Sequence, residues 1–383
     1  MFPGSVCWSI LLMMSLLSIY SINGSSANRS TKRNQHRQNT FAKRSDGNNE
    51  TASGLSGNYK LVKDWPSLSD EVTLGQVTSV AMRSDGILAM LHRAGRDWVP
   101  ASFDRQNRFR KVEEGPIAGN TVVYIDPETG KQLGQWGKEL FYLPHGLTID
   151  HEDNLWVTDA GAHQALKFTE AGSPLMALGT RLEPGEDNNH FCKPTSVAVE
   201  RRTRHIFVAD GYCNSRVMKF SPDGRLLFQL GKSGPAHMRF LAAWIRRPKG
   251  TEFNVVHSLA LDQERGVLFI ADRENGRIQA LMTEDMSIVG SMTSARFDGR
   301  VFAVGFSPAF GGLIIGMNGQ KAGGGIVQGF VLNPKSRQEK TMIVSTFGAQ
   351  RLKEPHDVKI SDDGKTIYVA ETRPHRISKY VLT

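Results

Sequence analysis

Three histidines occupy the same position in three similar segments, so their side chains could act together on one metal ion. His145 lies in Leu-Pro-His-Gly-Leu, His257 in Val-Val-His-Ser-Leu and His356 in Glu-Pro-His-Asp-Val. If these segments are equivalent units of one symmetric fold, the three imidazoles meet on its axis and form the ligand set of a catalytic zinc ion with one open position. The other eight of the eleven histidines, including His92 and His163, share no such register, and most are expected at the surface.

A carboxylate follows the third histidine. Asp357 occupies the position that Gly146 and Ser258 occupy after the other two histidines. A lone carboxylate beside the axis could bind a harder second ion such as Ca²⁺, together with backbone carbonyls. It could equally orient a metal-binding histidine from behind. The sequence leaves both possibilities open.

One tyrosine and two arginines could complete a site for acid–base chemistry. Tyr212 lies between Gly211 and Cys213, and a tyrosine close to a divalent metal can ionise below its usual pKa of about 10 and act as a base. A lone tyrosine is nevertheless more often a packing residue. Arg93 and Arg273 each follow a short strand signal and could bind a carboxylate with both guanidinium nitrogens. For each arginine, a surface ion pair is the simpler interpretation.

The elements that must position these residues are short strands in a repeated unit. Residues 256–281 combine period-two alternation, an acidic turn and a short apolar run, which is typical of strands with buried faces. Five more segments repeat this pattern in whole or in part, with openings near residues 80, 145, 195, 303 and 356. The intervals, roughly 46 to 65 residues, can each hold the four antiparallel strands of a propeller blade. The Val/Ile/Phe alternation disfavours a helical solenoid.

The sequence therefore predicts an all-β, six-bladed propeller over residues 57–383, without a second domain. Residues 59–62 are expected to supply the strand that completes the last blade and closes the ring. An acidic residue recurs after the apolar run of four blades and is expected to structure turns rather than to catalyse: Asp159, Asp210, Asp272 and Glu371.

The N-terminal part differs from the rest in composition. An apolar stretch at 8–22 followed by small residues indicates a secretory signal peptide over residues 1–26. Residues 27–56 form a polar, basic linker that is expected to be disordered, with glycosylation sequons at Asn28 and Asn49. Nearly half of the formal net charge of +9 lies in this linker, which together with the signal peptide favours a solvated linker, or a pro-segment that ends at Lys43-Arg44, over nucleic-acid binding. No later stretch approaches 18 consecutive apolar residues, so a secreted, soluble protein is expected.

The cysteine count fits an oxidising compartment. Of the three cysteines, Cys7 lies in the expected signal peptide, so Cys192 and Cys213 remain as an even pair. A disulfide between them is the natural interpretation, and two buried free thiols are the alternative.

Several longer motifs closely resemble one enzyme family. They are Phe-Tyr-Leu-Pro-His-Gly-Leu-Thr-Ile-Asp (141–150), His-Phe-Cys-Lys-Pro-Thr (190–195), Asp-Gly-Tyr-Cys-Asn-Ser-Arg (210–216), Ala-Asp-Arg-Glu-Asn-Gly-Arg-Ile-Gln (271–279) and Pro-His-Asp (355–357). Together they resemble peptidyl-α-hydroxyglycine α-amidating lyase, the second catalytic unit of the peptide C-terminal amidating system. The resemblance extends from about residue 76 to residue 380, which is essentially the whole folded part.

The resemblance implies a fold and a set of roles. The fold is a six-bladed propeller of NHL-type repeats. Zinc is then held by His145, His257 and His356, and a structural calcium by Asp357 with the carbonyls of Val80 and Leu147. Tyr212 becomes the catalytic base, Arg93 and Arg273 line the channel, and the Cys192–Cys213 disulfide lies beside Tyr212.

Two positions depart from the family pattern. A second disulfide of the family aligns with Phe269 and Ala280, which cannot form it. Glu354 replaces a methionine that commonly precedes the last Pro-His, and a carboxylate so close to the zinc site could alter substrate preference or pH dependence. The sequence contains no copper-monooxygenase half, so we expect a stand-alone lyase.

We therefore expect a zinc-dependent carbon–nitrogen lyase that cleaves peptidyl-(2-hydroxyglycine) into an amidated peptide and glyoxylate, the second step of peptide hormone amidation. It is expected to act as a monomer in the secretory pathway lumen and its granules, downstream of a separate copper monooxygenase. The alternative is a non-catalytic NHL propeller that binds a secreted peptide or protein. A calcium-dependent propeller hydrolase is less favoured, because such enzymes use carboxylate and Asn ligands where this chain has histidines.

Overall fold

The computed structural model describes residues 57–69, 72–231, 250–319, 325–334 and 342–383. In these residues the chain forms six four-stranded antiparallel sheets, as the repeats predict. The expected signal segment 1–26, the linker 27–56 and both sequons lie outside the described residues. Within the described part, no helix has the length and apolar character needed to cross a membrane.

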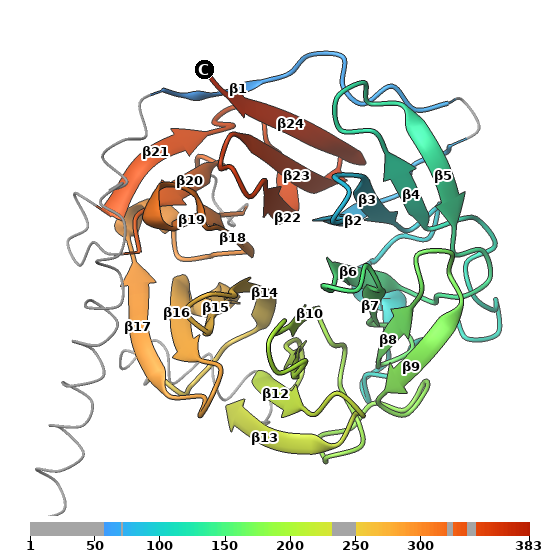
Figure 1. Ribbon diagram of the computed structural model, residues 1–383. Coiled ribbons are helices and arrows are strands. Elements are labelled where there is room, and N and C mark those ends of the chain that lie inside the picture. Colours follow the sequence, from blue (N-terminus) through green and yellow to red (C-terminus); the bar gives the residue numbers. More distant parts are fainter. Residues whose placement is uncertain (1–56, 70–71, 232–249, 320–324, 335–341) are drawn as a thin grey trace, which may run out of the picture. The chain divides into compact units, whose positions relative to one another are not determined.

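Each sheet is one blade, and the blades surround a central axis (Figure 1). Blade 1 contains β2 (Val77–Met82), β3 (Leu88–His92), β4 (Val122–Ile125) and β5 (Gln132–Trp136). Blade 2 contains β6 (Pro144–Ile149), β7 (Leu155–Asp159), β8 (Gln164–Phe168) and β9 (Pro174–Leu178). Blade 3 contains β10 (Ser196–Val199), β11 (Ile206–Asp210), β12 (Arg216–Phe220) and β13 (Leu226–Gly231).

The remaining blades follow the same order from the axis outward. Blade 4 contains β14 (Val256–Asp262), β15 (Val267–Asp272), β16 (Arg277–Met282) and β17 (Ile288–Thr293). Blade 5 contains β18 (Ala303–Ser307), β19 (Leu313–Met317), β20 (Gly329–Leu332) and β21 (Ile343–Phe347). Blade 6 contains β22 (Glu354–Ile360), β23 (Thr366–Arg373), β24 (Arg376–Leu382) and β1 (Tyr59–Leu61). Short 3₁₀ turns lie at η2 (Pro100–Ser102), η3 (Arg273–Asn275), η4 (Ala295–Phe297) and η5 (Ala309–Gly311).

The ring is closed by the strand that the sequence predicted. β1 pairs antiparallel with β24, with Tyr59 opposite Leu382 and Leu61 opposite Tyr380. The last blade therefore combines strands from both ends of the described chain. The innermost strands β2, β6, β10, β14, β18 and β22 contact one another in this order, and β22 contacts β2.

The apolar runs of the second strands have a simple physical reason. Each blade lies between two others, so a strand in its middle is covered on both faces, and every residue of β3, β7, β11 and β19 is buried. No residue of the outer strand β5 is buried, and three of the five residues of the outer strand β9 are exposed. The buried side chains form separate clusters between neighbouring blades, such as the cluster that joins Leu91 of blade 1 to Leu147 and Val157 of blade 2.

Antiparallel pairing brings the start of each innermost strand and the end of each second strand to the same edge of a blade. The recurring acids lie there, and their predicted structural role is confirmed. Asp159 accepts hydrogen bonds from the backbone N–H groups of Tyr142 and Leu143 at 2.6 and 2.8 Å. Asp210, Asp272 and Glu371 likewise accept from the backbone N–H groups of Cys192, Asn254 and Lys353. Each acid thus fixes the segment that leads into an innermost strand.

Candidate functional site

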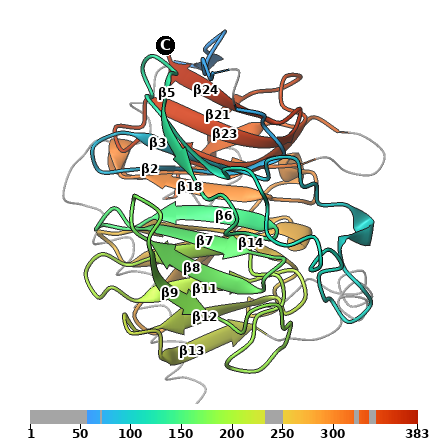
Figure 2. The same ribbon diagram turned by 90° about the vertical axis from the view of Figure 1, so that its right-hand side faces the viewer.

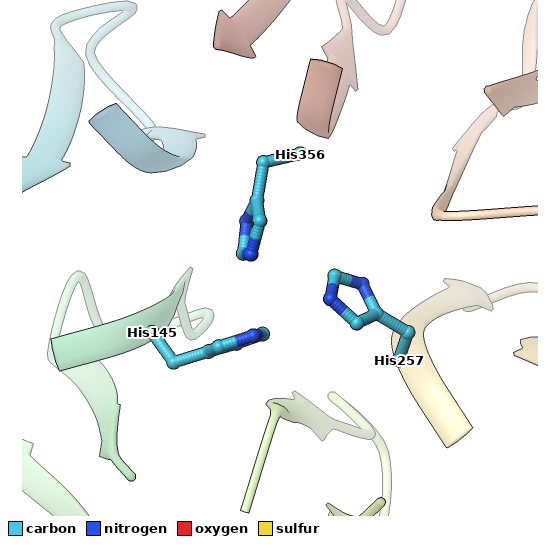
Figure 3. Close-up of side chains that lie close together, drawn as sticks. All are labelled: His145, His257 and His356. Atoms are coloured by element: carbon cyan, nitrogen blue, oxygen red, sulfur yellow. The ribbon is translucent and has the colours of Figure 1, made fainter. Parts of the chain in front are cut away.

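Three side chains meet on the axis. The rings of His145, His257 and His356 form a nearly equilateral triangle with centroid separations of 4.8, 4.5 and 4.7 Å. Figure 3 shows the three rings converging from three different blades. Their candidate ligand nitrogens all lie within 4.8 Å of one another, and in the described residues this is the one such group of His, Cys, Asp or Glu. These three residues are called the axial histidines below.

A β-bulge directs each axial histidine toward the axis. The pairing of β6 with β7 shifts between Pro144 and Gly146, so His145 has no partner residue across the ladder. The same shift leaves out His257 in blade 4 and His356 in blade 6. An extra residue in a strand leaves the ladder and re-aims its side chain. The bulges therefore turn three residues of the sheets into residues of the channel.

The other blades hold these rings in one orientation. His145 Nδ1 lies 2.8 Å from the carbonyl oxygen of Thr195, His257 Nδ1 lies 2.7 Å from that of Phe302, and His356 Nδ1 lies 2.6 Å from that of Thr78. Because a carbonyl oxygen only accepts, each Nδ1 must carry the hydrogen, and each Nε2 keeps a free lone pair in the neutral ring. Axial histidines and carbonyl acceptors alternate around the six blades.

The axial histidines are held neutral. Burial, and then the positive charge of neighbouring histidines and arginines, lowers the pKa of His145 and His257 well below the usual 6.5. Burial also lowers the pKa of His356 to about 3, with Arg93 and Arg273 contributing. A neutral imidazole is the form that binds a metal ion. The protonation state of the three rings therefore suits a metal ion between their Nε2 atoms.

Tyr212 lies against two of the axial histidines. Its hydroxyl oxygen is 3.0 Å from His145 Nε2 and 3.3 Å from His257 Nε2. The predicted disulfide is confirmed, because Cys192 and Cys213 are bonded with a Cα–Cα distance of 5.4 Å. It anchors the turn that carries Tyr212 to the segment that precedes β10.

The two arginines flank Tyr212 in different ways. Arg93 is buried, and its guanidinium donates to the carbonyl of Pro144 at 3.0 Å and to the side-chain oxygen of Gln76. Burial lowers its pKa to about 10, so it stays charged at neutral pH. Arg273 Nη1 is 3.5 Å from the Tyr212 hydroxyl, and its Nε donates to Glu274 at 2.9 Å. Arg93 is therefore not the surface ion pair of the competing interpretation, whereas Arg273 does form an ion pair, with Glu274, in addition to its contact with Tyr212.

Asp357 contacts the neighbouring blade rather than a histidine. Its carboxylate accepts from the Ser79 hydroxyl and, at 3.3 Å, from the N–H of Val80. The Ser79 hydroxyl also lies 3.3 Å from the carbonyl oxygen of Leu147. Asp357, Val80 and Leu147 thus lie around the Ser79 hydroxyl. The contact of Asp357 with Val80 uses the backbone N–H of Val80, not the carbonyl that was expected to bind calcium. Burial raises the pKa of Asp357 to about 6. The His356 ring is oriented by Thr78 instead.

Comparison with known proteins agrees with this geometry. Residues 191–220 match the NHL repeat model. The chain is 37% identical over 332 residues to peptidyl-alpha-hydroxyglycine alpha-amidating lyase 2 of Drosophila melanogaster, covering 84% of this chain and 75% of the relative. The chain belongs to the peptidyl-α-hydroxyglycine α-amidating lyase family. Lyase 1 of the same fly is 39% identical over 339 residues, which are 85% of this chain and 60% of the relative.

The family domain also occurs in longer proteins. The peptidyl-glycine alpha-amidating monooxygenase of Mus musculus is 39% identical over 337 residues, which are 86% of this chain but 32% of that protein. The chain thus spans about a third to three fifths of several curated relatives that it matches. Among solved structures, the WD40 propeller domain of Doa1 has a TM-score of 0.51 at 12% identity and covers 85% of this chain and 97% of that chain, which supports the propeller fold.

The structure shows the local contacts at the two positions that depart from the family pattern. Phe269 and Ala280 face each other across β15 and β16 and are both buried, so apolar packing occupies the place of the second disulfide. The Glu354 carboxylate accepts from the Thr372 hydroxyl at 3.1 Å and lies 3.9 Å from Arg373 Nη1. One carboxylate oxygen of Glu354 thus accepts a hydrogen bond, and the other lies at ion-pair distance from a largely exposed arginine.

Sequence reasoning missed three residues of the site. Ser79 shares its register with Asp357 and Ser258, so the repeat alignment contained a signal for it. Gln76 and Trp98 have no counterpart in the other blades. Trp98 belongs to the segment between β3 and β4, and its ring lies 4.8 Å from the Tyr212 ring and 6.1 Å from the His145 ring.

The expectation that most other histidines lie at the surface is wrong for two of them. His92 and His163 are buried, with 2% and 0% of their surface exposed. Both act as acceptors for the backbone, since Ala94 N–H donates to His92 Nδ1 at 3.1 Å and Lys193 N–H to His163 Nδ1 at 3.0 Å. His92 ends β3 at the position that acids occupy in four other blades, whereas His163 lies in the turn between β7 and β8.

Proposed function

We propose that this chain cleaves peptidyl-α-hydroxyglycines into peptide amides and glyoxylate. Two family members carry this activity in their names, peptidyl-alpha-hydroxyglycine alpha-amidating lyases 1 and 2 of Drosophila melanogaster. The observation that carries the proposal is the convergence of three Nε2 lone pairs and the Tyr212 hydroxyl at one point. This arrangement combines a cation site with a proton acceptor, and each can assist the cleavage of a carbinolamide.

Zinc fits the donor set of the axial histidines. A tyrosine hydroxyl has one hydrogen to donate, so Tyr212 can satisfy only one of the two Nε2 acceptors beside it. None of the described residues hydrogen-bonds to Nε2 of His356. Three neutral imidazoles that face one point are the usual ligands of a catalytic zinc with an open position. When bound, a zinc ion would polarise the substrate hydroxyl and favour its loss of a proton.

Tyr212 is the proposed base. Cleavage removes the proton from the hydroxyl of the α-carbon, while the C–N bond breaks and its electron pair moves to nitrogen. The departing nitrogen gains one proton and becomes the amide, and the α-carbon becomes the aldehyde of glyoxylate. Tyr212 can accept the first proton and return it to nitrogen, because its hydroxyl faces the axis and Arg273 lies 3.5 Å away to stabilise a phenolate.

Arg93 is proposed to orient the substrate carboxylate. Arg93 forms no ion pair with an acid in the described residues, and its Nε and Nη1 are held by Pro144 and Gln76. A fixed, charged guanidinium beside Tyr212 can bind the carboxylate of the hydroxyglycine with little loss of side-chain entropy. Arg273 already contacts Glu274, so we assign it mainly to Tyr212.

Calcium is proposed as a structural ion near Asp357. The Asp357 carboxylate, the Ser79 hydroxyl and the Leu147 carbonyl are oxygen atoms brought together from blades 6, 1 and 2. Calcium prefers such oxygen ligands. An ion there would also offset the cost of a buried carboxylate whose pKa is raised to about 6. It would join three blades at the axis.

Secretion is proposed on two grounds, the N-terminal composition and the disulfide between Cys192 and Cys213. The substrate would then come from a separate copper monooxygenase that hydroxylates peptidylglycines in the same compartment. The monooxygenases that match this chain combine a related region with further sequence.

The decisive test supplies the purified protein with a short peptidyl-α-hydroxyglycine and measures glyoxylate and peptide amide. Activity should disappear with a chelator and return with zinc, and elemental analysis should find about one zinc per chain. A His257→Ala variant should lose the zinc, whereas a His190→Gln variant should keep it, because His190 lies on a surface turn. A folded, zinc-loaded protein that releases no glyoxylate would support the non-catalytic binding propeller instead.

Tyr212→Phe tests the base. This variant keeps the ring against Trp98 but removes the hydroxyl, so zinc content should stay near one and turnover should fall by about 10²- to 10⁴-fold, the usual contribution of a general base. Tyr142→Phe is the matched control, since the Tyr142 hydroxyl lies at the same edge and accepts from Arg181. If Tyr212→Phe retains most of the turnover, another group is the base.

A further inference from the structure

The long connection between β3 and β4 sets blade 1 apart. Residues 93–121 join these strands, whereas residues 211–215 and 273–276 make the same connection in blades 3 and 4. Figure 2, which views the ring from the side, shows this teal segment projecting from one face of the ring. Antiparallel pairing places it at the edge where the axial histidines and Tyr212 lie. It is therefore in a position to contact what enters the site.

This connection is packed against blade 2 and hydrogen-bonded to it and to blade 1 by defined contacts. Phe109 packs with Tyr142, Leu143 and Ala162 of blade 2 in one buried cluster, and Trp98 and Phe103 pack against it. The backbone N–H of Trp98 donates to the buried side chain of Gln76 at 2.9 Å. The same Gln76 oxygen accepts from Arg93, so one amide holds both the arginine side chain and the backbone of Trp98.

The exposed part of this surface is aromatic and positively charged. Trp98 and Phe103 are half-buried, and their rings lie 5.2 Å apart. Lys193 Nζ lies 4.5 Å from the Phe103 ring centre and donates to the Asn107 side chain at 2.9 Å. Among the described residues, no acid forms an ion pair with Lys193. Trp98, Phe103 and Lys193 are called the aromatic shelf below.

The shelf begins where the reacting carbon must lie. The Trp98 ring is 4.8 Å from the Tyr212 ring and 6.1 Å from that of His145. One residue of extended peptide spans about 3.3–3.6 Å. A substrate whose terminal hydroxyglycine reaches Tyr212 therefore places its preceding residue beside Trp98, and an arrangement of half-exposed rings suits an apolar or aromatic side chain.

We propose that the aromatic shelf is the subsite for the residue that precedes the α-hydroxyglycine, with its side chain on Trp98 and Phe103 and its backbone carbonyl accepting from Lys193. This inference rests on the proposed function and adds a substrate preference to it. Apolar and aromatic residues are favoured at this position. Cationic residues are disfavoured, because Arg93, Arg273 and Lys193 already place positive charge around the site.

The test compares N-acetyl-X-α-hydroxyglycines in which X is Phe, Ala or Lys. The wild-type kcat/KM should be about tenfold higher for Phe than for Ala, and lower for Lys than for Ala. Phe103→Ala and Trp98→Leu should each reduce the ratio of Phe to Ala to about threefold or less. Phe228→Ala is the matched control, because Phe228 is exposed on the outer strand β13. This variant should have the same ratio of kcat/KM for the Phe and Ala substrates as the wild type.

A binding experiment tests the aromatic shelf independently of the proposed lyase activity. N-acetyl-Phe-Gly and N-acetyl-Ala-Gly lack the hydroxyl that reacts, and calorimetry measures their affinities without turnover. The wild type should bind the Phe compound about tenfold more tightly, and Phe103→Ala should remove most of this difference. Absence of turnover with this binding preference intact would overturn the proposed function but support the shelf. A wild-type ratio near one, or a ratio unchanged in both shelf variants, would overturn the shelf.

Discussion

His163 shows how one buried side chain can make the stability of the propeller depend on pH. Its Nδ1 accepts from the Lys193 N–H at 3.0 Å, and its ring is completely buried. Burial, and then the charge of Lys193, lowers the pKa of His163 to about 3. Burial lowers that of His92 to about 4. Both rings are therefore neutral in the folded protein at every pH at which the protein is expected to work.

The stability contributed by a histidine with a lowered pKa is complete above the unfolded value of about 6.5 and is lost as the pH falls. Between pH 6.5 and about 3, the unfolded chain binds a proton at His163 that the folded chain does not. The loss is at most about 1.4 kcal/mol per pH unit for each such histidine. Urea unfolding in the presence of a chelator at pH 7.5, 6.5 and 5.5 should show that the free energy of unfolding decreases below pH 6.5.

His163→Asn should flatten this pH dependence. Asparagine offers a side-chain oxygen near the position of Nδ1 and tolerates the positive φ of 60° at residue 163. The variant should lose stability at pH 7.5 through lost packing, but the decrease between pH 6.5 and 5.5 should be smaller by up to about 1.4 kcal/mol. His190→Gln, which removes a surface histidine whose pKa is raised by Asp187, should not flatten it. An unchanged slope in His163→Asn would mean that other groups control the acid response.

The residues of the site divide by how the sequence encodes them. The axial histidines were predictable because they share a register with each other, and symmetry brings that register to one axis. Trp98 and Gln76 belong to no repeated position, so only the folded arrangement connects them to Tyr212 and Arg93. His92 and His163 were misjudged because histidine at a turn gives no sign of its burial.

At the scale of elements, the disulfide connects two segments that must stay in register for Tyr212 to face the axis. Cys192 precedes β10 and Cys213 follows β11, with 21 residues of separation. Closing a loop of this length restricts the unfolded chain and is worth about 3 kcal/mol. Its loss should also loosen the turn on which Tyr212 stands.

The double variant Cys192→Ala with Cys213→Ala should lose about 3 kcal/mol in its free energy of unfolding. Its kcat should fall more than its zinc content, because the axial histidines come from other strands than the Tyr212 turn. Denaturant unfolding, elemental analysis and kcat on one substrate measure the three quantities. Equal turnover in the variant and the wild type would show that the contacts of Tyr212 with Trp98 and the axial histidines hold it without the disulfide.

The β-bulges are the feature of the strands that the sequence did not predict. The sequence indicated the number of blades and the innermost strands, because alternation and turn residues are local signals. It did not indicate that the ladder omits His145, His257 and His356, because a bulge depends on the partner strand. The register of the repeats was sufficient to gather these histidines, but the bulges explain why their rings reach the axis.

At the scale of the whole molecule, the ring depends on one short strand. β1 supplies three residues to blade 6, and Tyr59 is buried there with its ring 6.0 Å from that of Phe347. Its hydroxyl donates to the carbonyl of Gly364. Beyond β1, Asn58 and Thr383 exchange two backbone hydrogen bonds of 3.3 and 3.2 Å. The two ends of the described propeller are thus paired like the ends of a β-hairpin.

This pairing predicts that the propeller tolerates a circular permutation but not the loss of β1. A chain in which Thr383 continues through Asn-Gly into Asn58 would turn β24 and β1 into a two-residue hairpin, a connection that suits the twist of paired strands. New ends opened between Arg201 and Arg202 lie in an exposed turn after β10, at the edge away from the axial histidines. The permuted protein should keep its stability within about 1 kcal/mol and retain turnover.

A chain that begins at residue 63 lacks β1 and the buried Tyr59, and it should lose at least about 3 kcal/mol, the usual cost of deleting a buried aromatic side chain. Denaturant unfolding of both chains separates two explanations for the role of β1. If the permuted chain is stable and the truncated chain is not, β1 matters as the strand that closes blade 6, whichever covalent path supplies it. If the permuted chain is as unstable as the truncated one, closure depends on the order in which the blades form along the chain.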